Sequence, residues 1–373
     1  MNLCVVIALW AQCYPAADSS VIRGVYINPY QANRKEYMEE IFARADSGLI
    51  NAIVVDFKSD YGFLTYGSEL ELAKKISAVK KHFDAAYLVE NAAKHNLKLI
   101  ARIVCFRDNY LAQYKKFGLK DDSGKVWRDY KGMAWTNPYD ADVHDYLIAL
   151  TKEIVEQGVK SIAYDYVRFP TDGEVWRIRP TKVKGSRVDA IAGFLDKARK
   201  AVDAEIGICV FGFSIWRKLL SEGQDLSRLG EHIDVLYPML YPSHFDRAFR
   251  NEENEMWRNY WIYFDSVNEA LAKLPCSVKV MPFVQGFEYR AKEYNADYVF
   301  SQINGVLSAR GDGFIIWNAR SDYAICWPAF VWAGNSILKR YAQTCQDSHR
   351  RAKGRRCQDR DLPLQTPAAQ NQP

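Results

Sequence analysis

The residues best suited to chemistry close a short apolar run, Ser161-Ile-Ala-Tyr-Asp-Tyr-Val-Arg-Phe-Pro170. Apolar strands rarely end in an acid for packing reasons alone, because a buried charge needs a partner or a task. Asp165 is therefore a candidate catalytic carboxylate, and Arg168 is the nearby cation expected to orient it and keep it ionised. Pro170 has no N–H to donate, so the strand is expected to end before it.

Carboxylates, amides and aromatic residues also follow the other apolar runs. This mixture suits a sugar, because its hydroxyl groups need fixed hydrogen bonds and its ring faces stack on aromatic planes. Cleavage of a glycoside also requires two carboxyl groups. We expect Asp165 to be the stabilising carboxylate and Asp56 to be an accessory or acid–base carboxylate. The expected substrate-binding residues are Arg168, Tyr241, His244, Gln285, Trp317 and Asn318.

Other chemistries have weaker support. The six histidines show no H-x-H or H-E-x-x-H spacing, so no metal site is predicted. Neither a Gly-x-x-x-x-Gly-Lys phosphate loop nor a Gly-x-Ser-x-Gly motif occurs. Lys58 lies between Asp56 and Asp60, which would keep its amine protonated and a poor nucleophile. The sequence predicts no cofactor.

Eight strand-length apolar runs alternate with helical stretches. The runs cover residues 22–30, 52–59, 97–106, 161–165, 206–212, 233–241, 278–285 and 313–318. The clearest helical stretches cover residues 82–96, 140–157, 186–204 and 327–341. This order predicts a single (β/α)8 TIM barrel over residues 22–341, with the strand-end residues converging on one face.

An open, doubly wound sheet of eight strands is the structural alternative. Such a sheet places its ligand at one switch point, often next to a Gly-x-Gly-x-x-Gly motif after the first strand. That motif is absent here, and polar or aromatic residues close every strand. The barrel is therefore favoured.

The two ends of the chain differ from the rest in composition. Residues 1–17 include the apolar run Leu3–Ala11 and a small-residue segment, which is typical of a signal peptide and predicts export to the periplasm, cell envelope or medium. The run is too short to span a membrane as a helix. Residues 345–373 are polar and basic and are expected to be disordered.

The net charge of +5 for 373 residues is partly local. The basic tail carries six basic and three acidic residues, which leaves the remainder close to neutral. No strongly basic domain therefore indicates a nucleic-acid partner. The expected partner is a carbohydrate substrate, and no feature defines an oligomeric state.

Five motifs occur in the order found in one protein family. They are Trp135-Thr-Asn-Pro-Tyr139, Asp165-Tyr-Val-Arg-Phe-Pro170, Val210-Phe-Gly212, Tyr237-Pro-Met-Leu-Tyr-Pro-Ser-His244 and Trp317-Asn318. Over about residues 22–330 the chain resembles the putative glycoside hydrolase barrel family, distant kin of alpha-amylase-like and alpha-galactosidase-like enzymes. The resemblance implies a TIM barrel, a polysaccharide substrate and a nucleophile at Asp165.

One position departs from the family pattern, in which an Asp directly precedes Val-Phe-Gly. Here that residue is Cys209, and a thiol is a poor acid for a glycosidic oxygen. Either the general acid lies elsewhere, with Asp56, Glu288 and Asp322 as candidates, or the barrel binds carbohydrate without cleaving it. A second carboxyl group about 5–9.5 Å from Asp165 would favour the hydrolase. A third alternative is an envelope interaction protein that uses the basic tail.

Overall fold

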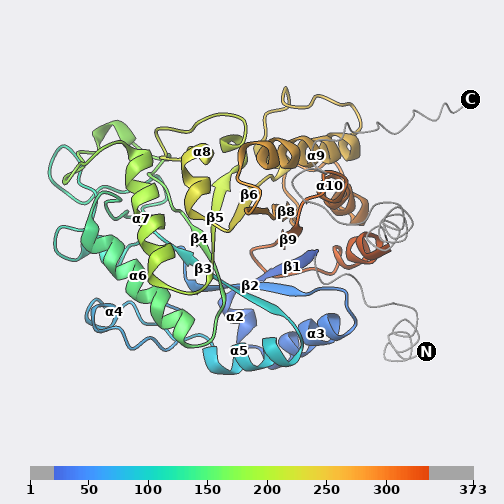
Figure 1. Ribbon diagram of the computed structural model, residues 1–373, viewed down its shortest axis with the longest axis horizontal. Helices are drawn as coiled ribbons and strands as arrows, with labels where there is room; N and C mark the ends of the chain where they lie inside the picture. Colours follow the sequence, from blue (N-terminus) through green and yellow to red (C-terminus); the bar gives the residue numbers. More distant parts are fainter. Residues whose placement is uncertain (1–20, 336–373) are drawn as a thin grey trace, which may run out of the picture.

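Parallel strands form a closed barrel in the computed structural model, which describes residues 21–335 (Figure 1). The strands are β1 (Ile22–Ile27), β2 (Ala52–Lys58), β3 (Lys98–Val104), β4 (Ser161–Asp165), β5 (Glu205–Phe211), β6 (Val235–Met239), β7 (Lys279–Val280), β8 (Phe283–Gln285) and β9 (Gly313–Trp317). From β1 to β6 each strand pairs in parallel with the next along the chain, and β9 pairs with β1 to close the ring. The predicted barrel is confirmed.

Helices surround this ring on the outside (Figure 1). They are α2 (Pro29–Ala32), α3 (Lys35–Asp46), α4 (Glu71–Lys75), α5 (Ala85–Lys94), α6 (Ala141–Glu156), α7 (Arg187–Ala201), α8 (Leu226–Leu229), α9 (Glu255–Lys273) and α10 (Ala296–Ser308). A further helix starts at Trp327 and continues to the last described residue. Single 3₁₀ turns occupy Leu111–Gln113, Val175–Arg177, Gly212–Ser214, Gly230–His232 and Pro242–His244.

The seventh predicted strand, 278–285, is two short strands. β7 and β8 both pair with β6, and β8 also pairs with β9, so together they fill one place in the ring. Pro282 lies between them and cannot donate a ladder hydrogen bond. The interruption therefore follows from a residue inside the predicted run.

Two apolar layers hold the barrel together, as alternation along the strands requires. The outer layer packs strands against helices and includes Val25, Ile53 and Ile162. The inner layer fills the barrel and includes Val54, Ile100 and Ala163. Polar side chains on inward-facing positions therefore emerge where the inner layer ends, at the carboxyl mouth of the barrel.

The predicted signal peptide (1–17) and basic tail (345–373) lie outside the described residues, as does the end of the predicted last helix. Within residues 21–335, no helix is both long and apolar enough to cross a membrane.

Candidate active site

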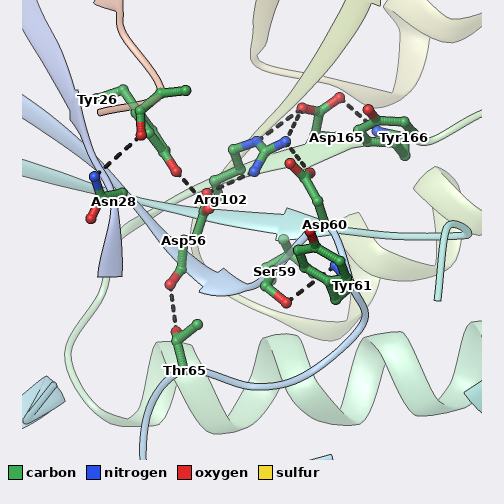
Figure 2. A network of polar contacts seen from close by, with 12 residues as sticks. Tyr26, Asn28, Asp56, Ser59, Asp60, Tyr61, Thr65, Arg102, Asp165 and Tyr166 are labelled. Carbon is green, nitrogen blue, oxygen red and sulfur yellow. Dashed lines mark hydrogen bonds and ion pairs between the residues drawn. The ribbon is translucent and has the colours of Figure 1, made fainter. Parts of the chain in front are cut away.

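An arginine at the centre of the mouth organises the site. Arg102 projects from β3, and its register partner on β2 is Asp56. Its side chain is only 2% exposed, so its charge requires internal partners. It finds them in three carboxylates, those of Asp56, Asp60 and Asp165 (Figure 2).

Each carboxylate uses a different part of the guanidinium. Oδ2 of Asp165 accepts from Nε at 2.9 Å and from Nη2 at 2.6 Å. Oδ1 of Asp56 accepts from Nη1 at 2.7 Å, and Oδ1 of Asp60 accepts from Nη2 at 2.8 Å. A planar fork with five N–H donors can hold three acids in this way, whereas a lysine ammonium could not span them.

These contacts limit the separation of the carboxyl groups. Asp165 Oδ2 and Asp60 Oδ1 share Nη2, so they lie no farther apart than the sum of the two bonds, about 5.4 Å. Asp56 Oδ1 bonds Nη1 and Asp165 Oδ2 bonds Nη2 of the same guanidinium. The two bonds and the spacing between these nitrogens limit the separation of the two oxygens to roughly 7.6 Å. Two carboxyl groups are thus close enough to Asp165 for glycoside hydrolysis.

Asp56 lies in the environment that best retains a proton. Burial raises the pKa of Asp56 to about 6, although the neighbouring Arg102 opposes this shift. Its Oδ2 is 2.7 Å from the Tyr26 hydroxyl, which can donate to the ionised acid or accept from the protonated one. Burial and the charge of Asp56 also raise the pKa of Tyr26 far above its usual value, so its hydroxyl stays neutral.

Asp60 has the opposite tendency. Burial disfavours its charge, but Arg102 outweighs that effect and lowers the pKa of Asp60 below its usual value. Its side chain is 41% exposed, against 7% for Asp56 and 9% for Asp165. Asp60 is therefore the ionised acid at the rim, and the other two lie deeper.

Asp165 is held at both oxygens. Its Oδ1 accepts from the backbone N–H of Tyr166 at 2.6 Å (Figure 2). Tyr166 has a φ of +48°, a left-handed conformation that is costly for a bulky residue. Such strain persists only where the surroundings enforce it, and it concentrates at functional sites.

Aromatic rings form one wall of the mouth. Tyr26 stacks on Trp317 with ring centroids 3.9 Å apart, and the Arg102 guanidinium carbon lies 5.0 Å from the Trp317 ring centroid. Trp317 thus lies beside the carboxylates, where a sugar ring would need a stacking surface.

Arg168 does not have the partner expected for it. Its guanidinium bonds the Phe169 carbonyl at 3.0 Å and lies 4.4 Å from the Phe211 ring centroid. The cation that binds Asp165 is Arg102, from the neighbouring strand. The sequence argument chose the arginine nearest in the chain, whereas the barrel brings in one from the strand alongside. A role for Arg168 in substrate binding stays a prediction.

The structure gives the other predicted binding residues different settings. Tyr241 is buried near the centre, where burial and then the charge of Asp165 raise its pKa well above its usual value. His244 is exposed, with its ring centroid 5.4 Å from that of Tyr241. Gln285 is fully buried and donates to the carbonyls of two loop residues. Asn318 donates to Gly286 at 2.6 Å. Gln285 and Asn318 thus position loops, and substrate contact remains a prediction for all four.

Cys209 lies in the inner layer of the barrel and is 1% exposed. Burial, and then the charge of Asp165, raise the pKa of its thiol well above its usual value. The thiol is therefore neutral and unreactive. Position 209 therefore contributes no acid, whereas the carboxylates around Arg102 are available close to it.

Arg102, Asp60 and Tyr26 were not among the predicted site residues. The signal for Arg102 was a charge inside the apolar run Lys98–Val104, which requires buried partners. Asp60 follows β2 in a turn, where a solvated acid is ordinary. Within residues 21–335, no cluster of His, Cys, Asp and Glu has the arrangement of a metal site.

The sequence pattern of one family, described as "Putative glycosyl hydrolase domain", matches residues 24–323. The chain belongs to this family. That match confirms the resemblance seen in the five motifs, and it spans every strand of the barrel except the first two residues of β1. No curated protein matches the sequence.

Several solved structures are similar to this barrel. The glycoside hydrolase domain of PgaB (BpsB) from Bordetella bronchiseptica is 9% identical, with a TM-score of 0.59, over 81% of this chain and 95% of that one. A maltogenic alpha-amylase, AmyB from Thermotoga neapolitana, is 12% identical, with a TM-score of 0.53, over 85% of this chain and 76% of that one. A hypothetical protein from Ruminiclostridium thermocellum is 29% identical over 49% of this chain and 96% of that one, with a TM-score of 0.47. The first two share the fold of this chain.

Proposed function

We propose that this member of the glycosyl hydrolase domain family cleaves O-glycosidic bonds of a polysaccharide, with Asp165 as nucleophile or stabilising carboxylate. The observation that carries the proposal is the set of three carboxylates around Arg102 at the carboxyl mouth. That mouth is where barrel enzymes place their chemistry.

The charge balance of this group favours a cationic transition state. One guanidinium faces three acids, so the centre stays negative even when Asp56 carries a proton. Glycoside cleavage develops positive charge on the sugar ring, and preorganised negative charge stabilises it. Arg102 fixes the acids without neutralising them all.

Within this proposal the three acids have separate tasks. Asp165, held at both oxygens, faces the anomeric carbon and either attacks it or stabilises its charge. Asp56 supplies the proton to the leaving glycosidic oxygen, because its raised pKa keeps it protonated in mildly acidic solution. Asp60 fixes Arg102 and faces the substrate at the rim.

Replacing Asp56 with Asn tests the acid assignment. The protonated form of Asp56 is required, so kcat of the unaltered protein should fall about tenfold per pH unit above roughly pH 6. Asp56→Asn should lower kcat by about 10²–10⁴-fold and remove this dependence on pH. The measurement is the rate of reducing-end release from pH 4 to 9.

The matched control is Asp203→Asn, an exposed acid just before β5 at the opposite end of the barrel. It should leave both rate and pH profile unchanged. If Asp56→Asn kept the descending limb and Asp60→Asn lost it, Asp60 would be the acid instead.

Replacing Cys209 with Ala tests whether the thiol takes part. Its raised pKa makes it a poor proton donor, and the proposal gives it no task. Hydrolysis by Cys209→Ala should therefore stay within about tenfold of the unaltered rate. A loss as large as that of Asp56→Asn would show that the thiol acts in the reaction.

Export remains part of the proposal. Cys276 is disulfide-bonded, and disulfides persist mainly in oxidising compartments outside the cytoplasm. A carbohydrate polymer in the periplasm, cell envelope or medium would be the substrate in that case.

The alternative, a barrel that binds carbohydrate without turnover, was motivated by Cys209 alone. It required that Asp165 lack a second carboxyl group at a suitable distance. Their shared contacts with Arg102 keep carboxyl oxygens of Asp60 and Asp56 no farther than about 5.4 and 7.6 Å from Oδ2 of Asp165, and this proximity supports hydrolysis.

A further inference from the structure

A second aromatic surface lies beside the carboxylate centre. Tyr61, Phe63, Asn109, Tyr110 and Gln113 line a hollow of about 370 Å³. We call this hollow the aromatic groove. Its volume is at the lower end of small-molecule sites, roughly 300–1,000 Å³.

Neighbouring rings at the groove are nearly parallel to one another, and one further ring is perpendicular to them. Tyr61 and Phe63 are nearly parallel, at 13°, with centroids 6.3 Å apart, and Phe63 is nearly parallel to His82 at 5.4 Å. Tyr110 meets Phe63 edge to face at 85°. Tyr61 is 60% exposed, so a large apolar ring face is open to solvent without packing against the core.

The groove is also rigid. Tyr61 N–H donates to Ser59 Oγ at 3.3 Å, and the Tyr61 carbonyl accepts from the N–H of Asn109 at 3.1 Å. The Asn109 side-chain carbonyl accepts from Ala134 N–H at 2.8 Å. These bonds fix the backbone that carries Tyr61 and the side chain of Asn109, which lowers the entropic cost of ordering the loop when a ligand binds.

The groove and the proposed active site are linked by two consecutive residues. Asp60 directly precedes Tyr61, and both project from the turn that closes β2 (Figure 2). A chain bound at the three carboxylates and leaving past Asp60 would meet the Tyr61 ring next.

The chemistry of the lining selects the occupant. None of the five lining residues carries a charge; three are aromatic and two are amides. Aromatic faces take the C–H face of a pyranose ring. The Asn109 amide already bonds Ala134, Arg128 and Met133, and the Gln113 NH2 group bonds the Asn109 carbonyl, so stacking on the rings would be the main contact. Two cations lie beside this lining: Arg128 Nη1 donates to Asn109 Oδ1 at 3.2 Å, and Lys80 Nζ lies 5.8 Å from the Tyr110 ring centroid.

We infer that the aromatic groove binds a sugar ring of the same polysaccharide chain, beyond the ring held at the carboxylates. This inference rests on the proposed function for the identity of the chain. It narrows the substrate to an extended polysaccharide and predicts that short oligosaccharides bind less well.

Affinity electrophoresis tests the inference without requiring turnover. Native gels would contain soluble amylose, galactomannan or hydroxyethylcellulose, and the full chain would carry Asp165→Asn so that no polymer is cleaved. At least one polysaccharide should retard this parent. Adding Tyr61→Ala or Tyr110→Ala should weaken binding about five- to tenfold, the loss expected for one stacked ring.

The matched control is Trp257→Ala on α9, a ring that is 54% exposed and lies outside the aromatic groove. It should be retarded like the parent, and thermal unfolding should be unchanged in all variants. Retardation by no polysaccharide, or equal retardation of the parent and both tyrosine variants, would overturn the inference.

Failure of the proposed function would look different. Binding that is lost with Tyr61→Ala, without release of reducing ends by the unaltered protein, would support the groove and contradict hydrolysis. Hydrolysis with an unchanged KM in Tyr61→Ala would support the active site and contradict the groove.

Discussion

Replacing Asp165 with Asn is expected to lower kcat/KM for a polysaccharide by at least about a thousandfold. The amide cannot attack the anomeric carbon or stabilise its positive charge. Its shape is nearly that of the acid, so the hydrogen bond from Tyr166 N–H to the side chain can persist. The measurement is reducing-end release under saturating and subsaturating substrate.

The same replacement should cost little stability. Three acids share one guanidinium, and removing the charge of Asp165 removes its repulsion toward Asp56 and Asp60 while Arg102 keeps those two partners. Thermal unfolding should therefore be close to that of the unaltered protein, and Asp203→Asn serves as the active control. A folded Asp165→Asn protein with normal activity would refute the assignment.

Replacing Arg102 with Met should damage both stability and activity. The change leaves three carboxylates at the barrel mouth, two of them nearly buried, without their shared cation. Removing one partner of a buried ion pair costs about 3–5 kcal/mol of unfolding free energy. Denaturant unfolding at pH 7 measures this loss, and hydrolysis should be undetectable because the acids lose their positions.

Measuring the stability of Arg102→Met at two pH values distinguishes loss of the Arg102 charge from loss of its packing. Without the cation the pKa of the neighbouring carboxyl groups rises, so protonation at pH 4 should remove much of the penalty seen at pH 7. Arg102→Lys keeps the charge but not the fork and should be intermediate. Equal destabilisation at the two pH values would show that Arg102 acts mainly by packing.

The barrel was predictable because its signal is repeated. Each strand is an apolar run of ordinary length, and each is followed by helix before the next begins. The prediction erred where one residue changed the outcome, as Pro282 did by dividing the seventh strand into β7 and β8.

The carboxylates proposed to be catalytic were predictable only in part. Asp165 and Asp56 close their strands, and that position alone places them at the mouth. Arg102 lies 63 residues from Asp165 and 46 from Asp56, so their contacts depend on strand order and inward orientation. No local pattern contains that information, and Arg168 was the only cation that proximity in sequence offered.

The sequence did not identify which acid would act with Asp165 in the proposed reaction. Cys209 occupies the family's expected position, and a single sequence cannot show which other acid approaches. In the closed barrel β2 lies next to β3. The turn after β2 places Asp60 within hydrogen-bond distance of the Arg102 guanidinium, which also binds Asp165. Tertiary structure thus brings Asp56 and Asp60, the two candidates for the missing acid, to the guanidinium that holds Asp165.

The most direct test is reducing-end release by the unaltered protein from soluble polysaccharides at pH 5, where Asp56 is largely protonated. The account predicts that at least one polymer is shortened and that Asp165→Asn shortens none. Binding of a polymer in affinity gels with no release of reducing ends by the unaltered protein would contradict it.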